Sequence, residues 1–194
     1  MQSALSLSTN RLLKILLFLL FFLSSNIYAQ EDLKGNKQTL SLLPTNSIAP
    51  VNVLKDISNS EHTFPTANKW NIIFYWSLFC HSCIEEMPEI QTNLEKIKDI
   101  SIFFVSLDTE KMQKALINFK KRRKFSSTIL MEKIEKEKYL TADTWGVTMT
   151  PSIFVVNPNG IITFAHQGPI DVDLLLNNLP KEIIKSSENE NNEK

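Results

Sequence analysis

An abrupt change of hydrophobic pattern around residues 76–83 limits the possible folds of this chain more than any other feature. Residues 72–76 (IIFYW) are all β-branched or aromatic, which is typical of a short strand buried on both faces. After them, apolar side chains recur every three or four residues from Cys83 to Ile97, which is the pattern of an amphipathic helix. The sequence therefore predicts a strand, a tight turn and a helix, with Cys80 at the helix N-terminus and Cys83 one turn further in.

The chain contains two cysteines, and both belong to this Cys80-x-x-Cys83 turn. At a helix N-terminus the free backbone N–H groups and the helix dipole stabilise a thiolate, and a protonated His81 would act in the same direction. A disulfide across two intervening residues removes little chain entropy, and a structural zinc site needs about four ligands. The pair therefore favours redox chemistry over a structural disulfide or a metal site.

Strand and helix patterns alternate along the rest of the chain. Strands are predicted at 102–107, 127–131, 152–156 and 161–165, with an Asn159-Gly160 turn between the last two. Helices are predicted after a cap at Asp108 or Thr109, in a short segment ending at Trp145, and over 171–179. Residues 49–54 and 62–64 predict an additional N-terminal hairpin. The alternation indicates an α/β sheet with helices on both faces.

Composition excludes several classes of function. The 21 basic and 21 acidic residues give a formal net charge of zero, which argues against a nucleic-acid binder with a broad basic surface. The four glycines are too far apart for a phosphate-cradling loop, and the three histidines form no zinc-binding helix motif. We therefore expect no nucleic-acid partner, no organic cofactor and no metal.

The ends of the chain differ in character from its middle. Basic residues precede an uninterrupted apolar run at 15–23, which is shorter than the roughly 20 residues that a membrane span needs. We predict a signal peptide at 1–29, a linker at 30–46, one folded domain at 47–180 and a polar, disordered tail at 181–194. Cleavage of the signal is favoured over an uncleaved anchor. The protein is then periplasmic or otherwise extracytoplasmic, where disulfides persist.

Three segments together resemble a known family. They are WSLFCHSCIEEMPEI (76–90), WGVTMTPSIFVVNPNG (145–160) and HQGPIDVDLLLNNL (166–179). The chain resembles the TlpA/ResA-like exported thiol/disulfide oxidoreductases from about residue 49 to residue 179. The resemblance implies a thioredoxin fold, that is, a central mixed β-sheet flanked by helices, here with the extra N-terminal hairpin. It also implies a cis peptide bond between Thr150 and Pro151, beside the cysteines.

Catalytic roles follow from the cysteine positions and from the resemblance. Cys80, the outer cysteine, is expected to attack a substrate disulfide as a thiolate, and Cys83 is expected to resolve the mixed disulfide. Glu86 follows Cys83 by three residues and matches the acid that this family uses to help Cys83 lose its proton. The alternative for Glu86 is an ordinary first-turn glutamate stabilised by the helix dipole.

The resemblance also implies which residues contact the substrate: Phe79, His81, Thr150 and Pro151. Two of these depart from the family pattern. Phe79 replaces the usual tryptophan, and His81-Ser82 replaces the commoner Gly-Pro or Pro-Pro pair. Since such residues tune thiolate stability, the resemblance does not fix the redox direction.

The expected function is reduction of disulfides in partner proteins, such as apocytochrome c or another exported cysteine protein. The resemblance implies a membrane electron donor of the DsbD/CcdA type, and the protein is expected to be a monomer. Two alternatives stay open. One is a thiol oxidase or isomerase on the same fold, and the other is a non-enzymatic extracytoplasmic module that binds copper or a client through its thiols.

Overall fold

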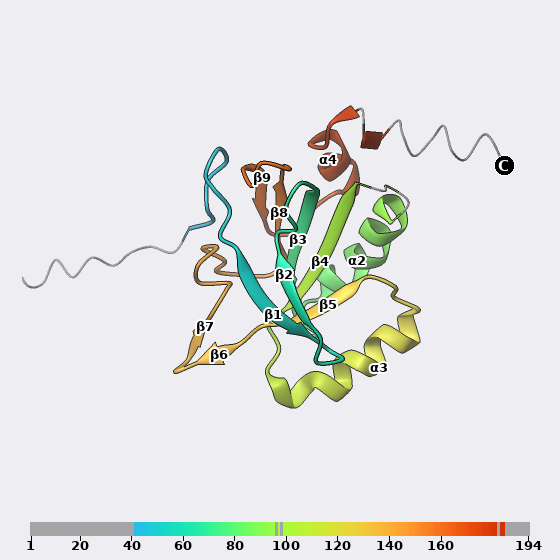
Figure 1. Cartoon of the computed structure of the whole chain (residues 1–194). Helices are drawn as coiled ribbons and strands as arrows, with labels where there is room; N and C mark the ends of the chain where they lie inside the picture. Colours follow the sequence, from blue (N-terminus) through green and yellow to red (C-terminus); the bar gives the residue numbers. More distant parts are fainter. Residues whose placement is uncertain (1–40, 96, 98, 182, 185–194) are drawn as a thin grey trace, which may run out of the picture. The chain divides into compact units, whose positions relative to one another are not determined.

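The computed structural model describes residues 41–95, 97, 99–181 and 183–184, and Figure 1 shows its elements. Its strands are β1 (Asn52–Asp56), β2 (Glu61–Phe64), β3 (Trp70–Trp76), β4 (Ile100–Ser106), β5 (Thr128–Met131), β6 (Ile134–Glu135), β7 (Lys138–Tyr139), β8 (Ser152–Val156) and β9 (Ile162–Gln167). Its helices over the described residues are α2 (His81–Leu94), α3 (Gln113–Arg123) and α4 (Val172–Asn177), and the 3₁₀ turn η1 (Glu110–Met112) precedes α3.

Seven strands form one mixed sheet in the order β2-β1-β5-β4-β3-β8-β9. The pairs β3–β4 and β4–β5 are parallel, and the other pairs in this sheet are antiparallel. The predicted N-terminal hairpin is confirmed as β1 and β2, which extend the sheet through β5. Because β3, β4 and β5 run the same way, their carboxyl ends lie level at one edge, where Trp76 is opposite Ser106 and Ser106 is opposite Met131.

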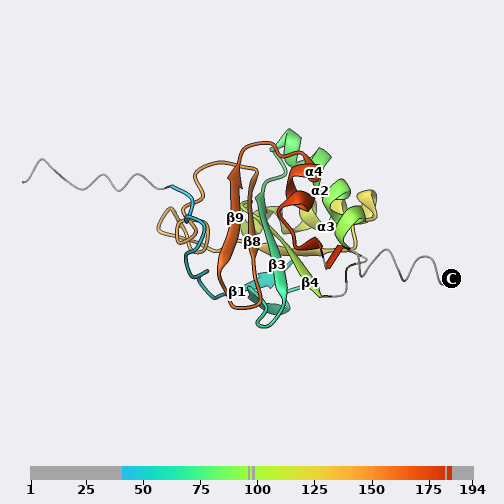
Figure 2. The ribbon, with the colours of Figure 1, turned by 90° about the horizontal axis from the view of Figure 1, so that it is seen from above.

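One face of the sheet is covered by α2, α3 and α4 (Figure 2). Alternate residues of β3 point to this face, and they are Ile72, Phe74 and Trp76. The helices contribute apolar side chains that include Met87 of α2, Leu116 of α3 and Leu175 of α4, and all of these side chains are fully buried. The predicted apolar stripe of the cysteine helix is therefore confirmed.

The opposite face of the sheet is covered differently. Ile73 and Tyr75 of β3 pack there against Trp145, with Leu42 and Leu43 beside them. The prediction of helices on both faces is therefore wrong for the described residues, because the segment ending at Trp145 forms turns. The buried carboxylate of Glu132 binds the backbone N–H groups of residues 141 and 142 at the start of these turns, and Gly146, with a φ of +70°, ends them a few residues later. A helix-type bond, from Trp145 N to Thr141 O at 2.9 Å, forms in between, so the segment is too short for a regular helix.

The packed part of the chain extends beyond the predicted boundaries of 47 and 180. Within the predicted linker, Leu43 N donates to Trp145 O at 3.1 Å and Asn46 N donates to Ile162 O at 2.8 Å. Within the predicted tail, Ile183 and Ile184 pack against the helix-covered core. The predicted signal peptide lies outside the described residues, and no helix among the described residues is long and apolar enough to span a membrane.

Candidate active site

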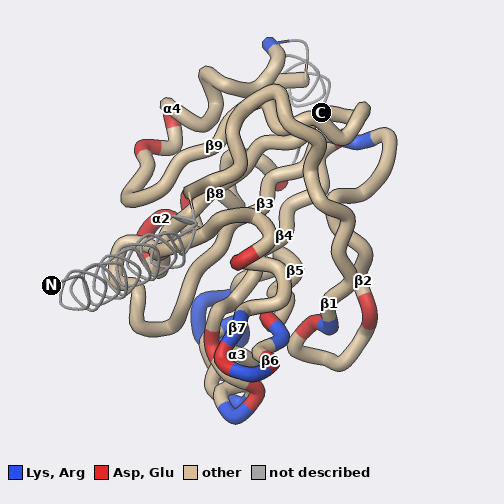
Figure 3. The backbone as a smooth tube through the Cα atoms, turned by 90° about the vertical axis from the view of Figure 1, so that its left-hand side faces the viewer, with Lys and Arg blue, Asp and Glu red and all other residues tan. Residues whose placement is uncertain are grey.

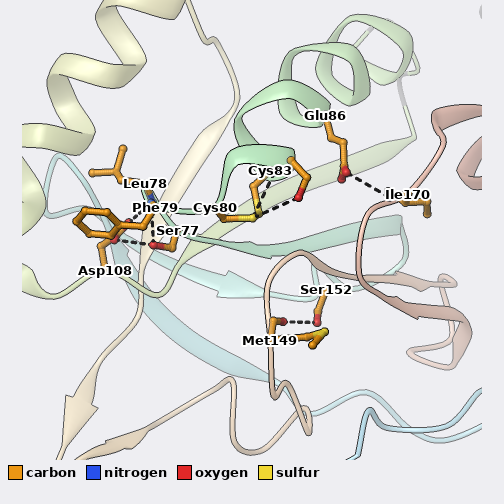
Figure 4. The surroundings of a disulfide bond; sticks show 11 residues. Ser77, Leu78, Phe79, Cys80, Cys83, Glu86, Asp108, Met149, Ser152 and Ile170 are labelled. Carbon is orange, nitrogen blue, oxygen red and sulfur yellow. Dashed lines mark hydrogen bonds between the residues drawn. A yellow bond between two sulfur atoms is a disulfide. The ribbon is translucent and has the colours of Figure 1, made fainter.

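The two cysteines lie where the prediction placed them, at the start of α2. Cys80 is the N-cap residue, and Cys83 lies one turn inside the helix. Their sulfur atoms form a disulfide, shown in Figure 4. The Cys83 sulfur is buried, whereas Cys80 is partly exposed, and Cys83 N donates to Cys80 Sγ at 3.3 Å. This N–H group is one of the free donors of the helix N-terminus, so it stabilises negative charge on the outer sulfur once the disulfide opens.

The two residues between the cysteines have different surroundings. The Ser82 hydroxyl lies 3.6 Å from Cys80 Sγ, which adds a second polar hydrogen to the outer sulfur. The His81 ring is 88% exposed and its Nε2 lies 3.2 Å from Glu85 Oε1. His81 therefore lies at the surface beside the outer cysteine, where a partner protein can reach it.

A second loop lies next to the disulfide. The Thr150–Pro151 peptide bond is cis, as the resemblance implied. The loop is fastened to its neighbours, since Ser152 Oγ donates to Met149 O at 2.8 Å and Gly168 N donates to Pro151 O at 2.8 Å. Phe79 and Met149 are 83% and 55% exposed, so two apolar side chains face solvent near the outer sulfur.

Glu86 lies on the same side of α2 as Cys83 and is half-buried. Its Oε1 accepts a hydrogen bond from Ile170 N at 3.2 Å, whereas Oε2 is buried and finds no hydrogen-bond partner among the described residues. Burial raises the pKa of this carboxyl to about 7, and the neighbouring Glu85 and Glu89 add to the shift while the Ile170 N–H opposes it. A carboxyl with this pKa can both accept and release a proton at neutral pH.

Asp108 was expected only as a helix cap, and the structure places it elsewhere. Thr109 is the N-cap of η1 and makes no side-chain cap bond. The Asp108 carboxylate is buried and is bound to the residues just before Cys80 (Figure 4). The sequence carried one signal for this contact. Asp108 follows the predicted strand at 102–107, and if that strand runs parallel to the cysteine strand, both end at the same edge of the sheet.

The fold is shared with several solved structures. StoA from Bacillus subtilis has 21% sequence identity and a TM-score of 0.55, with 66% of this chain and 95% of that chain covered. A thiol:disulfide interchange protein DsbE from Chlorobium tepidum has 19% identity and a TM-score of 0.59, with 71% and 96% covered. At these identities the likeness shows the fold, which is the thioredoxin fold.

A sequence relative and a family model cover the same region. The Sporulation thiol-disulfide oxidoreductase A of Bacillus subtilis (strain 168) is 22% identical over 132 residues, which is 66% of this chain and 78% of the relative. The AhpC/TSA family model matches residues 45–165, more than half of the chain, and this range contains both cysteines and the cis-Pro loop. The chain therefore belongs to the AhpC/TSA family.

Proposed function

We propose that the protein is a thiol/disulfide oxidoreductase that reduces disulfides in partner proteins. The observation that carries this proposal is the Cys80–Cys83 disulfide at the N-terminus of α2, with a partly exposed outer cysteine and a buried inner one. The names of its relatives, a thiol-disulfide oxidoreductase and a thiol:disulfide interchange protein, support the same chemistry.

The reaction proceeds in two exchange steps. The Cys80 thiolate attacks one sulfur of the client disulfide, which forms a mixed disulfide and releases the other client sulfur as a thiolate. Cys83 then loses its proton and attacks Cys80 Sγ, which releases the second client thiolate and closes the Cys80–Cys83 disulfide. Two electrons pass from the protein dithiol to the client, so a donor must return two electrons before the next cycle.

Glu86 serves in the second step as the proton acceptor for Cys83. It is one helical turn from Cys83, and one of its oxygens carries no hydrogen bond among the described residues. A pKa of about 7 lets the carboxylate take the thiol proton near neutral pH and release it afterwards. This role makes Cys83 a faster nucleophile without requiring a low pKa of its own.

Client binding is assigned to the surface around the outer cysteine. Phe79 and His81 border it on one side, and Thr150 and Pro151 lie in the loop next to the disulfide. We propose extended segments of exported cysteine proteins, including apocytochrome c, as clients and a DsbD/CcdA-type membrane protein as electron donor. We also propose that the segment 1–29 directs export and that the protein is a monomer.

Trapping a mixed disulfide tests the reaction. With Cys83→Ser the second step cannot occur, so the variant should accumulate a covalent complex between Cys80 and a client or a model protein with an accessible disulfide. A thiol reductant should release the client from this complex, and no complex should form with Cys80→Ser. Recovery of free client from both variants would overturn the proposal, and stoichiometric Cu(I) binding without a trapped client would favour the copper-binding alternative.

The reduction potential tests the direction. We expect a value near or below the thioredoxin level of about −270 mV, where the disulfide is stable and the dithiol is a reductant. A value approaching about −120 mV would instead make the protein a thiol oxidant. Equilibration of the whole protein with glutathione buffers, followed by alkylation of the free thiols, measures it.

A further inference from the structure

We propose that Asp108 is a positioning residue for the redox-active turn, through a set of hydrogen bonds that joins the end of β4 to the residues before Cys80. The inference rests on the redox role of Cys80 and Cys83 proposed above and adds a residue outside the cysteine helix. The hydrogen-bonded set of Asp108, Ser77, Leu78 and Ser106 is called the Asp108 clasp.

Asp108 is 5% exposed, and its carboxylate is bonded on both oxygens. Oδ1 accepts a hydrogen bond from Ser77 Oγ at 2.9 Å. Oδ2 accepts one from the backbone N of Leu78 at 2.9 Å and one from Ser106 Oγ at 2.7 Å. Hydrogen bonds to a buried carboxylate are stronger than those between neutral groups, so the residues of the turn are held firmly to the end of β4.

From Ser77 the contacts continue to the outer cysteine. Ser77 Oγ accepts a hydrogen bond from Phe79 N at 3.2 Å, and Ser77 O accepts one from Cys80 N at 3.0 Å. The backbone N–H groups of Leu78, Phe79 and Cys80 therefore all donate hydrogen bonds to Ser77 or to Asp108. The clasp fixes the backbone immediately before the outer sulfur.

A fixed turn affects the balance between dithiol and disulfide. The disulfide is favoured when both sulfurs are held close together in the reduced protein, because little freedom is then lost on bond formation. Cys83 lies inside the packed helix. Cys80 is held on one side by the helix, through Ile84 N on its carbonyl at 3.2 Å, and on the other side by the turn, through its own N–H on Ser77 O, so the clasp controls one of the two constraints on the outer cysteine. Loosening the turn should make the disulfide easier to reduce.

The test measures the equilibrium with glutathione in the full-length protein. The reaction is dithiol + GSSG → protein disulfide + 2 GSH, in which two electrons pass from the protein to glutathione. Asp108→Asn replaces one of the two acceptor oxygens with an NH₂ group. This group is itself a donor, so it cannot accept the hydrogen bonds that Asp108 receives at that position. We expect the equilibrium constant for forming the protein disulfide to fall about tenfold, which raises the reduction potential by about 30 mV.

Glu132→Gln is the matched control. Glu132 is also buried and lies just beyond the carboxyl end of a parallel strand, but its carboxylate binds Lys133 N, Thr141 and Ala142 N and not the cysteine turn. This variant should lose stability while its glutathione equilibrium stays within about twofold of the wild-type value. An equal fall in both variants would show a general effect of loosening the fold and would overturn the proposal.

Ser77→Ala separates the clasp from the charge of Asp108 and replaces Asp108→Asn if that variant does not fold. It keeps the carboxylate but removes the bonds to Asp108 and Phe79, so the equilibrium constant should fall in the same direction by a smaller factor. Values within about twofold of wild type for the folded variants would overturn the inference. Failure of Cys83→Ser to trap any client would affect the proposed function alone, because the glutathione equilibrium needs no client.

Discussion

At the residue scale, Glu86 links the acid–base chemistry of the site to the stability of the fold. Burial raises the pKa of its carboxyl to about 7, above the ordinary value of 4.5, so the folded protein binds this proton more tightly than the unfolded chain does. The stabilising contribution is complete below about pH 4.5 and is lost as the pH rises through about 7.

Glu86→Gln should remove this pH dependence. The variant should gain stability relative to wild type as the pH rises from about 5 to about 8, by about 1 kcal/mol, because half-exposure of the group reduces the effect of its pKa shift. Urea unfolding of the oxidised proteins at both pH values measures the difference. Parallel stability curves would show that the pKa of Glu86 is not raised in the folded protein.

The same variant tests catalysis separately. If Glu86 accepts the proton of Cys83, the rate at which the mixed disulfide resolves should rise in wild type as the pH passes through about 7, and Glu86→Gln should be slower and lack that step. Stopped-flow mixing of the dithiol with a model disulfide gives this profile. An unchanged profile would assign Glu86 a structural role only.

At the scale of elements, the turns at 140–146 take the place that the sequence assigned to a helix. Gly146 ends them with a φ of +70°, a conformation that favours glycine. A Cβ added at Gly146 would lie 1.8 Å from the carbonyl oxygen of Ser41. The turns and the segment that begins at Ser41 are therefore packed too closely for any side chain at this position.

Gly146→Ala should destabilise the protein by several kcal/mol, because it combines backbone strain with a clash against backbone atoms (roughly 3 kcal/mol or more). Gly160→Ala is the matched control, since its φ is +76° but no atom lies within 4 Å of the added Cβ. It should cost about 1 kcal/mol from backbone strain alone. Thermal unfolding of both variants tests this, and equal losses would contradict the close approach of Ser41.

Local patterns predicted some elements well and missed others for physical reasons. The strand at 72–76 was predictable because all its residues are buried and apolar, and the helix after it was predictable because its buried residues recur every three or four positions. The turns before Trp145 were not, because Gly146 ends the segment only a few residues after the N–H groups that Glu132 binds, and the contact with Glu132 leaves no mark in the periodicity. The contact between Asp108 and Leu78 likewise depends on two parallel strands ending at one edge, which no local pattern encodes.

At the scale of the whole described domain, the two faces of the sheet are built from different material. Three helices cover one face, whereas residues from before β1 help to cover the other (Figures 1 and 2). The segment that starts at Ser41 is therefore part of the fold.

Basic residues are gathered around α3 in Figure 3, and the last turn of this helix carries Lys120, Lys121, Arg122 and Arg123.

Leu43→Ala should lower the free energy of unfolding by about 1–2 kcal/mol, because Leu43 is partly buried against the cluster around Trp145. Val51→Ala, at a side chain that is 70% exposed, is the control and should change stability by less than about 0.5 kcal/mol. Denaturant unfolding of the full-length chain distinguishes the two. If Leu43→Ala behaved like the control, residues 41–46 would act as the linker that the sequence predicted.

The segment just before β1 has a consequence for how copies of the protein meet each other. Asn46 N and Ala49 N donate to the carbonyl groups of Ile162 and Gly160, and Ile162 N donates to Ser47 O. These bonds use the outward backbone groups at the start of β9, the last strand of the sheet. An exposed strand edge invites pairing with another chain and hence aggregation. Residues 46–49 therefore protect the sheet at this point, so that the chain's own backbone occupies the positions that a neighbouring molecule would otherwise take.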